Sequence, residues 1–121
     1  MQKNSLMEAT RDDVKSFLDN LRLKIDIFGV IYLNRSKNTQ TLLDLDISPS
    51  SRTKIIKELK VEDYSEGPLS ENMNGWPDMW VFGKQIKGTE VYIKVSMGNE
   101  NNKSICISFH SSEHPMQYPF K

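Results

Sequence analysis

The second half of the chain decides its fold, because residues 79–110 read MWVFGKQIKGTEVYIKVSMGNENNKSICISFH. Within this stretch, residues 89–97 alternate strictly between apolar and polar side chains, and residues 104–110 do the same. Such alternation is typical of a strand with one buried face. Residues 79–86 are rich in aromatic and apolar side chains and also favour a strand. Because only short links separate the three segments, they predict an antiparallel meander.

The first half carries helical spacing instead. Residues 12–21 place their apolar side chains at i, i+3, i+4 and i+7, which is one face of a helix. A second helix is predicted over residues 49–60, with Ser48 as its cap and Pro49 at its first position. Residues 39–45 are a further helical candidate, whereas residues 22–27 fit either a short strand or the approach to another helix. The apolar residues 28–33 leave helix and strand open.

These elements predict an α+β fold in which N-terminal helices pack on one face of a C-terminal antiparallel sheet. The 121 residues are enough for one domain over residues 1–121, with residues 1–11 expected as a flexible tail. Residues 69–76 are expected to form a loop. Residues 115–121 contain two prolines, so they are expected to lie extended across the body outside the central sheet.

Composition limits the class of function. The chain has 16 basic and 16 acidic residues, so a strongly basic nucleic-acid-binding protein is excluded, although a local basic patch is not. Five acidic and no basic residues fall within residues 61–81, which suggests a solvated acidic loop. One cysteine excludes an intrachain disulfide and a cysteine-rich zinc site. With no signal-like or membrane-spanning segment in the sequence, a cytoplasmic location is expected.

The strand pattern also predicts which side chains face outward. If the helices cover the apolar face, the opposite face displays six polar or ionisable side chains: Tyr92, Lys94, Ser96, Cys106, Ser108 and His110. Polar residues on the solvent side of a sheet are expected without any function. A tyrosine, a lysine and a histidine together can nevertheless hold and move protons, as a metal-free ribonuclease requires. In such an enzyme the RNA supplies the nucleophile, its 2′-hydroxyl.

Other motifs indicate less. His110 and His114 have a spacing that would suit a metal only on a helix, which this segment does not resemble, so no metal site is predicted. Cys106, which lies between two apolar strand positions, is expected to be an inert filler, with a nucleophile as the alternative. Trp76 and Trp80 are expected to anchor the core, with base stacking as the alternative.

Several segments of the chain resemble a known family of small bacterial proteins. They are VEDYSEGP at 61–68, DMWVFGK at 78–84, EVYIK at 90–94, ICISFH at 105–110, EHPM at 113–116 and YPFK at 118–121. Together they are similar to the MqsR-like toxins of type II toxin–antitoxin systems, which belong to the RelE-like superfamily. The resemblance covers residues 12–121. It implies helices packed on an antiparallel sheet, an mRNA endonuclease activity that needs no metal or other cofactor, and a cognate antitoxin as partner.

The resemblance also suggests site residues. Tyr92 occupies the position of an active-site tyrosine, and His110 follows Ser-Phe where the family has a catalytic lysine. Tyr92 and His110 are therefore the expected acid–base pair. Two other positions depart from the family, because Val81 replaces a glutamine and Glu66 replaces a lysine.

Nearby residues are candidates to fill these gaps. Lys84 and Lys94 are expected to stabilise the charge on the reacting phosphate in place of the missing lysine, and Gln85 is the stand-in for the glutamine. Trp80, Gln85 and Lys87 are the expected RNA-binding residues. The rival hypothesis is a catalytically degenerate RelE-like module that only docks an antitoxin or another protein, and a structural domain is the third.

Overall fold

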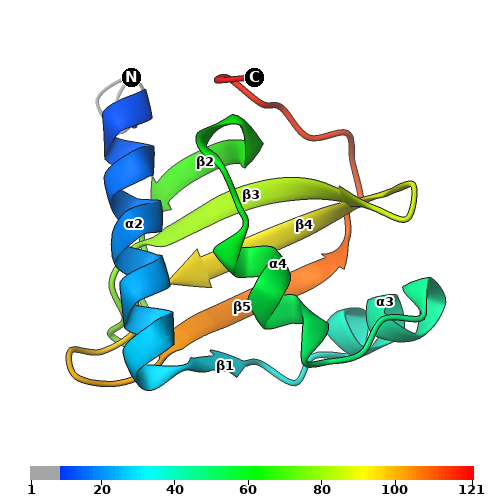
Figure 1. Cartoon of the computed structure of the whole chain (residues 1–121), viewed down its shortest axis with the longest axis horizontal. Coiled ribbons are helices and arrows are strands. Elements are labelled where there is room, and N and C mark those ends of the chain that lie inside the picture. The colour runs from blue at the N-terminus through cyan, green and yellow to red at the C-terminus, as the bar shows by residue number, and fades with distance from the viewer. Residues whose placement is uncertain (1–8) are drawn as a thin grey trace.

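A computed structural model describes residues 9–121 and contains a mixed five-stranded sheet with helices against one face (Figure 1). The strand order is β1-β5-β4-β3-β2, with β1 parallel to β5 and the other neighbours antiparallel. The strands are β1 (Val30–Tyr32), β2 (Tyr64–Leu69), β3 (Met79–Ile86), β4 (Thr89–Ser96) and β5 (Ser104–Ser111). The α+β class is confirmed, and the three predicted strands form the centre of the sheet.

The helices precede most of the sheet in the chain. They are α2 (Arg11–Phe28), α3 (Ser36–Leu45), α4 (Ser51–Lys57) and the 3-10 turn η1 (Val61–Asp63). The predicted helix at 12–21 therefore continues through the stretch left open at 22–27. A tail was expected over residues 1–11. Residues 1–8 lie outside the described residues, and Thr10 and Arg11 do not belong to a tail, because Thr10 caps α2 and Arg11 is its first residue. Thr10 caps α2 by accepting a hydrogen bond from the Asp13 amide at 3.1 Å.

The second predicted helix is shorter than its pattern suggested. Ser48 and Pro49 precede α4, which begins at Ser51 without a side-chain cap. The Ser48 hydroxyl instead lies 2.7 Å from the Ser51 hydroxyl. A hydroxyl paired with another hydroxyl does not satisfy a free amide, so the expected capping role of Ser48 is wrong.

The core lies between α2, α4 and one face of the sheet. It is formed by fully or almost fully buried side chains: Val14, Phe17, Leu18, Leu21, Ile25, Ile56, Leu59, Tyr64, Phe82, Val91, Ile93, Val95, Cys106 and Phe109. The predicted apolar faces of both helices and of β4 contribute to it. Since Ile93 and Val95 point into the core, their neighbours Tyr92 and Lys94 must point to the opposite side, here called the open face.

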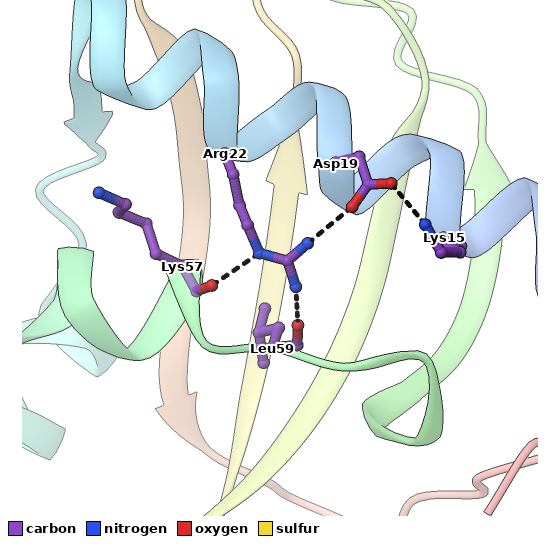
Figure 2. A network of polar contacts seen from close by, with 5 residues as sticks. All are labelled: Lys15, Asp19, Arg22, Lys57 and Leu59. Atoms are coloured by element: carbon purple, nitrogen blue, oxygen red, sulfur yellow. Dashed lines mark hydrogen bonds and ion pairs between the residues drawn. The ribbon is translucent and has the colours of Figure 1, made fainter.

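Arg22 joins α2 to the segment that follows α4 (Figure 2). Its Nε donates to the Lys57 carbonyl at 2.8 Å, and its Nη2 donates to the Leu59 carbonyl. The remaining Nη1 donates to Asp19 at 3.1 Å, and Asp19 in turn pairs with Lys15. Two carbonyls that no longer have helical partners are thus satisfied by one guanidinium group.

A β-bulge changes the register of β5. Lys94 pairs with Ser108, but the next residue, Val95, pairs with Cys106, so Ile107 is the extra residue. The inserted residue reverses the alternation, and Cys106 enters the core with 1% exposure. The expectation that Cys106 shares the open face with Ser108 is therefore wrong, because that expectation assumed an unbroken period of two.

Helix α3 protects the edge of β5 beyond the short strand β1. The Asn38 side chain accepts from the Phe109 amide at 2.9 Å and donates to the Ile107 carbonyl at 3.2 Å. Further along, the Ser111 amide donates to the Thr41 hydroxyl at 2.9 Å. These buried side chains replace a neighbouring strand, so β5 presents little free edge to another chain.

The sequence did not reveal the two outer strands. β1 lies within the ambiguous residues 28–33 and is only three residues long. β2 lies inside the acidic stretch 61–81, which is consequently not a solvated loop throughout but holds η1, β2 and the start of β3. The loop expected at 69–76 is found between β2 and β3 at 70–78, because Leu69 still belongs to β2.

Candidate active site

The antiparallel pairing of β4 with β5 brings the predicted acid–base residues together on the open face. Tyr92 pairs with His110, and Lys94 pairs with Ser108. The rings of Tyr92 and His110 are stacked, with centroids 5.2 Å apart and planes 14° from parallel. The Lys94 ammonium lies 5.9 Å from the centre of the Tyr92 ring. Phenol, imidazole and ammonium therefore form one cluster, as the period of two predicted.

This cluster lies in a groove with a volume of about 610 Å³. Its lining comes from five parts of the chain: Arg35 from the link before α3, Ser65 and Glu66 from β2, Tyr92 and Lys94 from β4, Ser108 and His110 from β5, and residues 112–117 after β5. We refer to this space as the groove. It is large enough to hold a nucleotide unit, since ligand sites commonly measure a few hundred Å³.

One side of the groove is formed by the segment that follows β5. Residues 112–121, here called the strap, contain no strand and run away from the end of β5 (Figure 1). The expectation that residues 115–121 lie outside the central sheet is confirmed. Its first half borders the groove, whereas Tyr118 lies over Gly83 of β3.

Two cations in the groove lack a partner. Neither the Arg35 nor the Lys94 side chain forms a hydrogen bond or ion pair with residues 9–121. Burial lowers the pKa of the Lys94 ammonium, and the nearby positive charge of Arg35 lowers it further, while Glu66 acts in the opposite direction. Two like charges that Glu66 offsets only in part provide a site for an anion.

The surroundings of His110 and Tyr92 determine where each ring can accept or donate a proton. The His110 Nδ1 lies 2.9 Å from the Ser111 carbonyl, and a carbonyl oxygen only accepts, so Nδ1 carries the hydrogen in this contact. In the neutral ring, Nε2 is then left with a lone pair. Burial raises the pKa of the Tyr92 phenol, and the charge of Glu66 raises it further. At neutral pH, Tyr92 is therefore a proton donor.

Lys84 and Trp80 do not reach the groove, although both were expected at the site. They share the helix-covered face of β3 with Phe82, because alternate residues of a strand point the same way. Trp80 stacks on Phe17 with ring centroids 4.6 Å apart, which is the core-anchoring role of the two considered for it. Lys84 pairs with Asp63 at 3.3 Å. Lys84 was expected to stabilise a phosphate at the site. The structure instead places its ammonium in an ion pair with Asp63 of η1, outside the groove.

Gln85 and Lys87 also lie outside the groove lining. Gln85 is exposed near the end of β3, opposite Glu90. The Lys87 ammonium donates to the carbonyls of Leu45 and Asp46 at 2.9 and 3.0 Å, where it caps the last turn of α3. Gln85 thus faces solvent and Lys87 caps a helix, and neither lies with the Tyr92–His110 cluster; their RNA contacts stay a prediction.

Arg35 and Glu66 are among the groove residues that sequence reasoning did not assign to the site. Arg35 lies in a short polar link with no periodicity, so no sequence signal pointed to it. Glu66 was noted only because a lysine stands at its position in the resembling family. Arg35 follows β1 at one edge of the sheet, and Glu66 lies in β2 at the other edge. The sequence pattern gave no sign that these two segments approach the same groove.

No family model, curated protein or solved structure matches this chain in the three comparisons made with known proteins. Within residues 9–121, no three His, Cys, Asp or Glu side chains are grouped as a metal site would require. None of the helices described here has the length and apolar character needed to cross a membrane. The functional interpretation consequently rests on the geometry of the groove and on the motifs quoted above.

Proposed function

We propose that this protein is a metal-independent endoribonuclease that cleaves single-stranded mRNA in the groove, as the toxin of a type II toxin–antitoxin pair. The observation that carries the proposal is the cluster of Tyr92, His110 and Lys94 in one groove, beside the second unpaired cation, Arg35. Acid, base and phosphate-binding groups are what this reaction requires of a protein, because the RNA provides the nucleophile. This activity would be exerted in the cytoplasm, where mRNA is translated.

The proposed reaction assigns one task to each group. His110 Nε2 removes the proton from a ribose 2′-hydroxyl, and the 2′-oxygen forms a bond to the adjacent phosphorus. The bond from phosphorus to the 5′-oxygen breaks, and Tyr92 gives its proton to that leaving oxygen. Lys94 and Arg35 stabilise the negative charge that develops on the phosphate. The products are a 2′,3′-cyclic phosphate and a 5′-hydroxyl, and His110 then returns its proton to Tyr92 through water.

A cleavage assay on a defined single-stranded RNA tests this proposal. We expect wild-type protein to cut in the presence of EDTA and to leave 2′,3′-cyclic phosphate ends. A single 2′-deoxy substitution at the cut position should block cleavage there, because the nucleophile is missing. His110→Ala and Tyr92→Phe should each lower the rate by about 10²–10⁴-fold, the usual contribution of a general acid or base.

Lys54→Ala is the matched control, because Lys54 is exposed on α4 and does not line the groove. The control should cut at the wild-type rate. If wild-type protein leaves the RNA intact, or if both site variants keep full activity while folded, the proposed ribonuclease is refuted.

The partner expected for such a toxin is an antitoxin protein encoded by a neighbouring gene. Expression of the chain alone should stop growth and deplete mRNA, and co-expression of the neighbouring protein should restore growth. A harmless wild-type chain would argue against the toxin assignment.

The rival function is a degenerate module that binds an antitoxin without cutting RNA. The observation that favours it is Glu66, whose carboxyl group lines the groove and offsets part of the positive charge there. A protein that co-purifies with the neighbouring gene product but cuts no RNA would support this rival.

A further inference from the structure

The strap is attached to the sheet through one carboxylate, that of Glu90 on β4. The Met116 amide donates to Glu90 Oε1 at 3.2 Å, and the Tyr118 hydroxyl donates to Glu90 Oε2 at 2.7 Å. The Ser112 amide donates to the Glu90 backbone carbonyl at 2.8 Å. Hydrogen bonds to an ionised carboxylate are stronger than those between neutral groups, so Glu90 is the principal polar anchor of this segment.

The sheet is also shaped to receive the strap. A Cβ added to Gly83 of β3 would lie 2.1 Å from the Tyr118 hydroxyl oxygen and 2.9 Å from the Met116 sulfur. Neither approach is compatible with any side chain at this position. The missing side chain therefore lets the tyrosine and the methionine lie directly on the strand, where Glu90 binds them.

The strap is fixed on both sides of this anchor. Before it, Glu113 pairs with Lys37 of α3 at 2.5 Å. After it, the Phe120 ring stacks on Tyr64 with centroids 5.3 Å apart, and Arg11 donates to the Phe120 carbonyl at 2.8 Å. The part that lines the groove, residues 112–117, contains the Glu113 attachment and ends just before Tyr118.

We propose that Glu90 is a positioning residue that acts through Tyr118 and Met116 to hold the strap as a wall of the RNA-binding groove. Glu90 does not line the groove itself, so its effect on the reaction is indirect. The inference rests on the proposed ribonuclease function and adds to it the element that shapes RNA binding. A wall contacts RNA in the ground state and the transition state alike, and its loss therefore raises KM and leaves kcat unchanged.

Glu90→Gln and Tyr118→Phe test the anchor from both ends. The amide keeps one acceptor but loses the charge and one oxygen, and phenylalanine loses only the donor hydroxyl. Each variant should speed hydrogen exchange in residues 112–118 and raise KM for a short RNA on the order of tenfold, with kcat changed less than about twofold. Because both changes weaken the same contact between Glu90 and Tyr118, the effects of the two substitutions should be less than additive in the double variant.

Glu58→Gln is the control, since it makes the same chemical change at an exposed residue of the α4 end, away from the strap. It should leave exchange and kinetics at wild-type values. Gly83→Ala provides an independent displacement of the strap by steric contact, and it should raise KM in the same way. The pH dependence of kcat should be the same in all these variants, because Tyr92 and His110 are untouched.

The outcomes separate this inference from the proposed function. If wild-type protein cuts RNA and the variants loosen the strap but keep the wild-type KM, the strap does not shape the groove and the inference is overturned. A fall in kcat at constant KM would also overturn it, because Glu90 would then take part in the chemistry. Unchanged exchange in the strap would show that Glu90 is not its anchor. If wild-type protein does not cut RNA at all, the proposed function itself fails.

Discussion

Removal of the two unpaired groove cations should reduce the salt dependence of nucleic-acid binding by a predictable amount. For a single strand, each phosphate neutralised by a cation contributes about −0.7 to the slope of log affinity against log salt. Arg35 and Lys94 carry no hydrogen bond or ion pair to residues 9–121, so both are available for phosphates. They should therefore contribute about −1.4 together.

The corresponding change in affinity can be stated for a practical range of salt. Between 50 and 200 mM, one phosphate contact weakens binding about 2.6-fold and two contacts weaken it about sevenfold. Arg35→Gln and Lys94→Gln should each make the slope shallower by about 0.7, and the double variant by about 1.4. The effect is expected to be additive in the slope even if the affinities themselves are not.

Fluorescence anisotropy with a labelled single-stranded 2′-deoxy oligonucleotide measures this slope, since the probe lacks the 2′-hydroxyl and is not cut. Lys54→Gln on α4 is the control that removes one exposed positive charge outside the groove. Its slope should match that of the wild type. If the groove variants keep the wild-type slope, or if the control changes as much as they do, phosphates do not bind at Arg35 and Lys94 and the reasoning is refuted.

Further predictions concern stability and reactivity. Arg22→Met should lower the free energy of unfolding by about 2–4 kcal/mol, measured by urea denaturation, because two carbonyls lose a charged donor; a loss below about 0.5 kcal/mol would contradict the bridging role. Thr10→Ala should cost about 1 kcal/mol in the same assay, since it removes the α2 cap, whereas Thr10→Ser should cost much less. Burial raises the pKa of the Cys106 thiol to about 12, which keeps it protonated and unreactive. A thiol reagent at pH 8.5 should label Cys106 only in urea, and rapid labelling of the native protein would disprove its burial. Because the unfolded thiol ionises near pH 9, its contribution to stability should be present below that pH and be lost as the pH rises from about 9 to about 12.

The central sheet was predictable because alternation survives wherever a strand has one buried face. β3 matches its predicted bounds, and β4 and β5 differ by one residue at one end. The outer strands lacked this signal. β1 has three residues, and β2 contains Gly67 and Pro68, which suggest a turn rather than a strand. Residues 22–27 alternate between apolar and polar side chains, which left a short strand open as an assignment. They belong to α2, and the apolar residues Leu23 and Ile27 are exposed on it, so the alternation did not reflect burial.

The site was predictable only where it followed from the period of two. Tyr92, Lys94 and His110 share a face because the register between β4 and β5 is regular there, up to the bulge at Ile107. That bulge could not be predicted, since no glycine or proline marks it, and it moved Cys106 to the core. Residues from other parts of the chain, such as Arg35, reach the groove through tertiary contacts that the sequence pattern does not encode.

The neutral net charge of the chain fits a groove that binds few phosphates. A nucleic-acid-binding protein that makes six to ten phosphate contacts loses about 10³–10⁵ in affinity over the same range of salt, whereas two groove cations account for about sevenfold. Electrostatic attraction is therefore a small part of any binding energy here, and the rest must come from the shape of the groove and from base contacts. A strap held in place over the sheet provides such a shape. Naked RNA should be tested at low salt, where the contribution of Arg35 and Lys94 is largest. The strap variants should lower affinity by the same factor at every salt concentration, because the part of the strap that lines the groove, residues 112–117, contains no lysine or arginine.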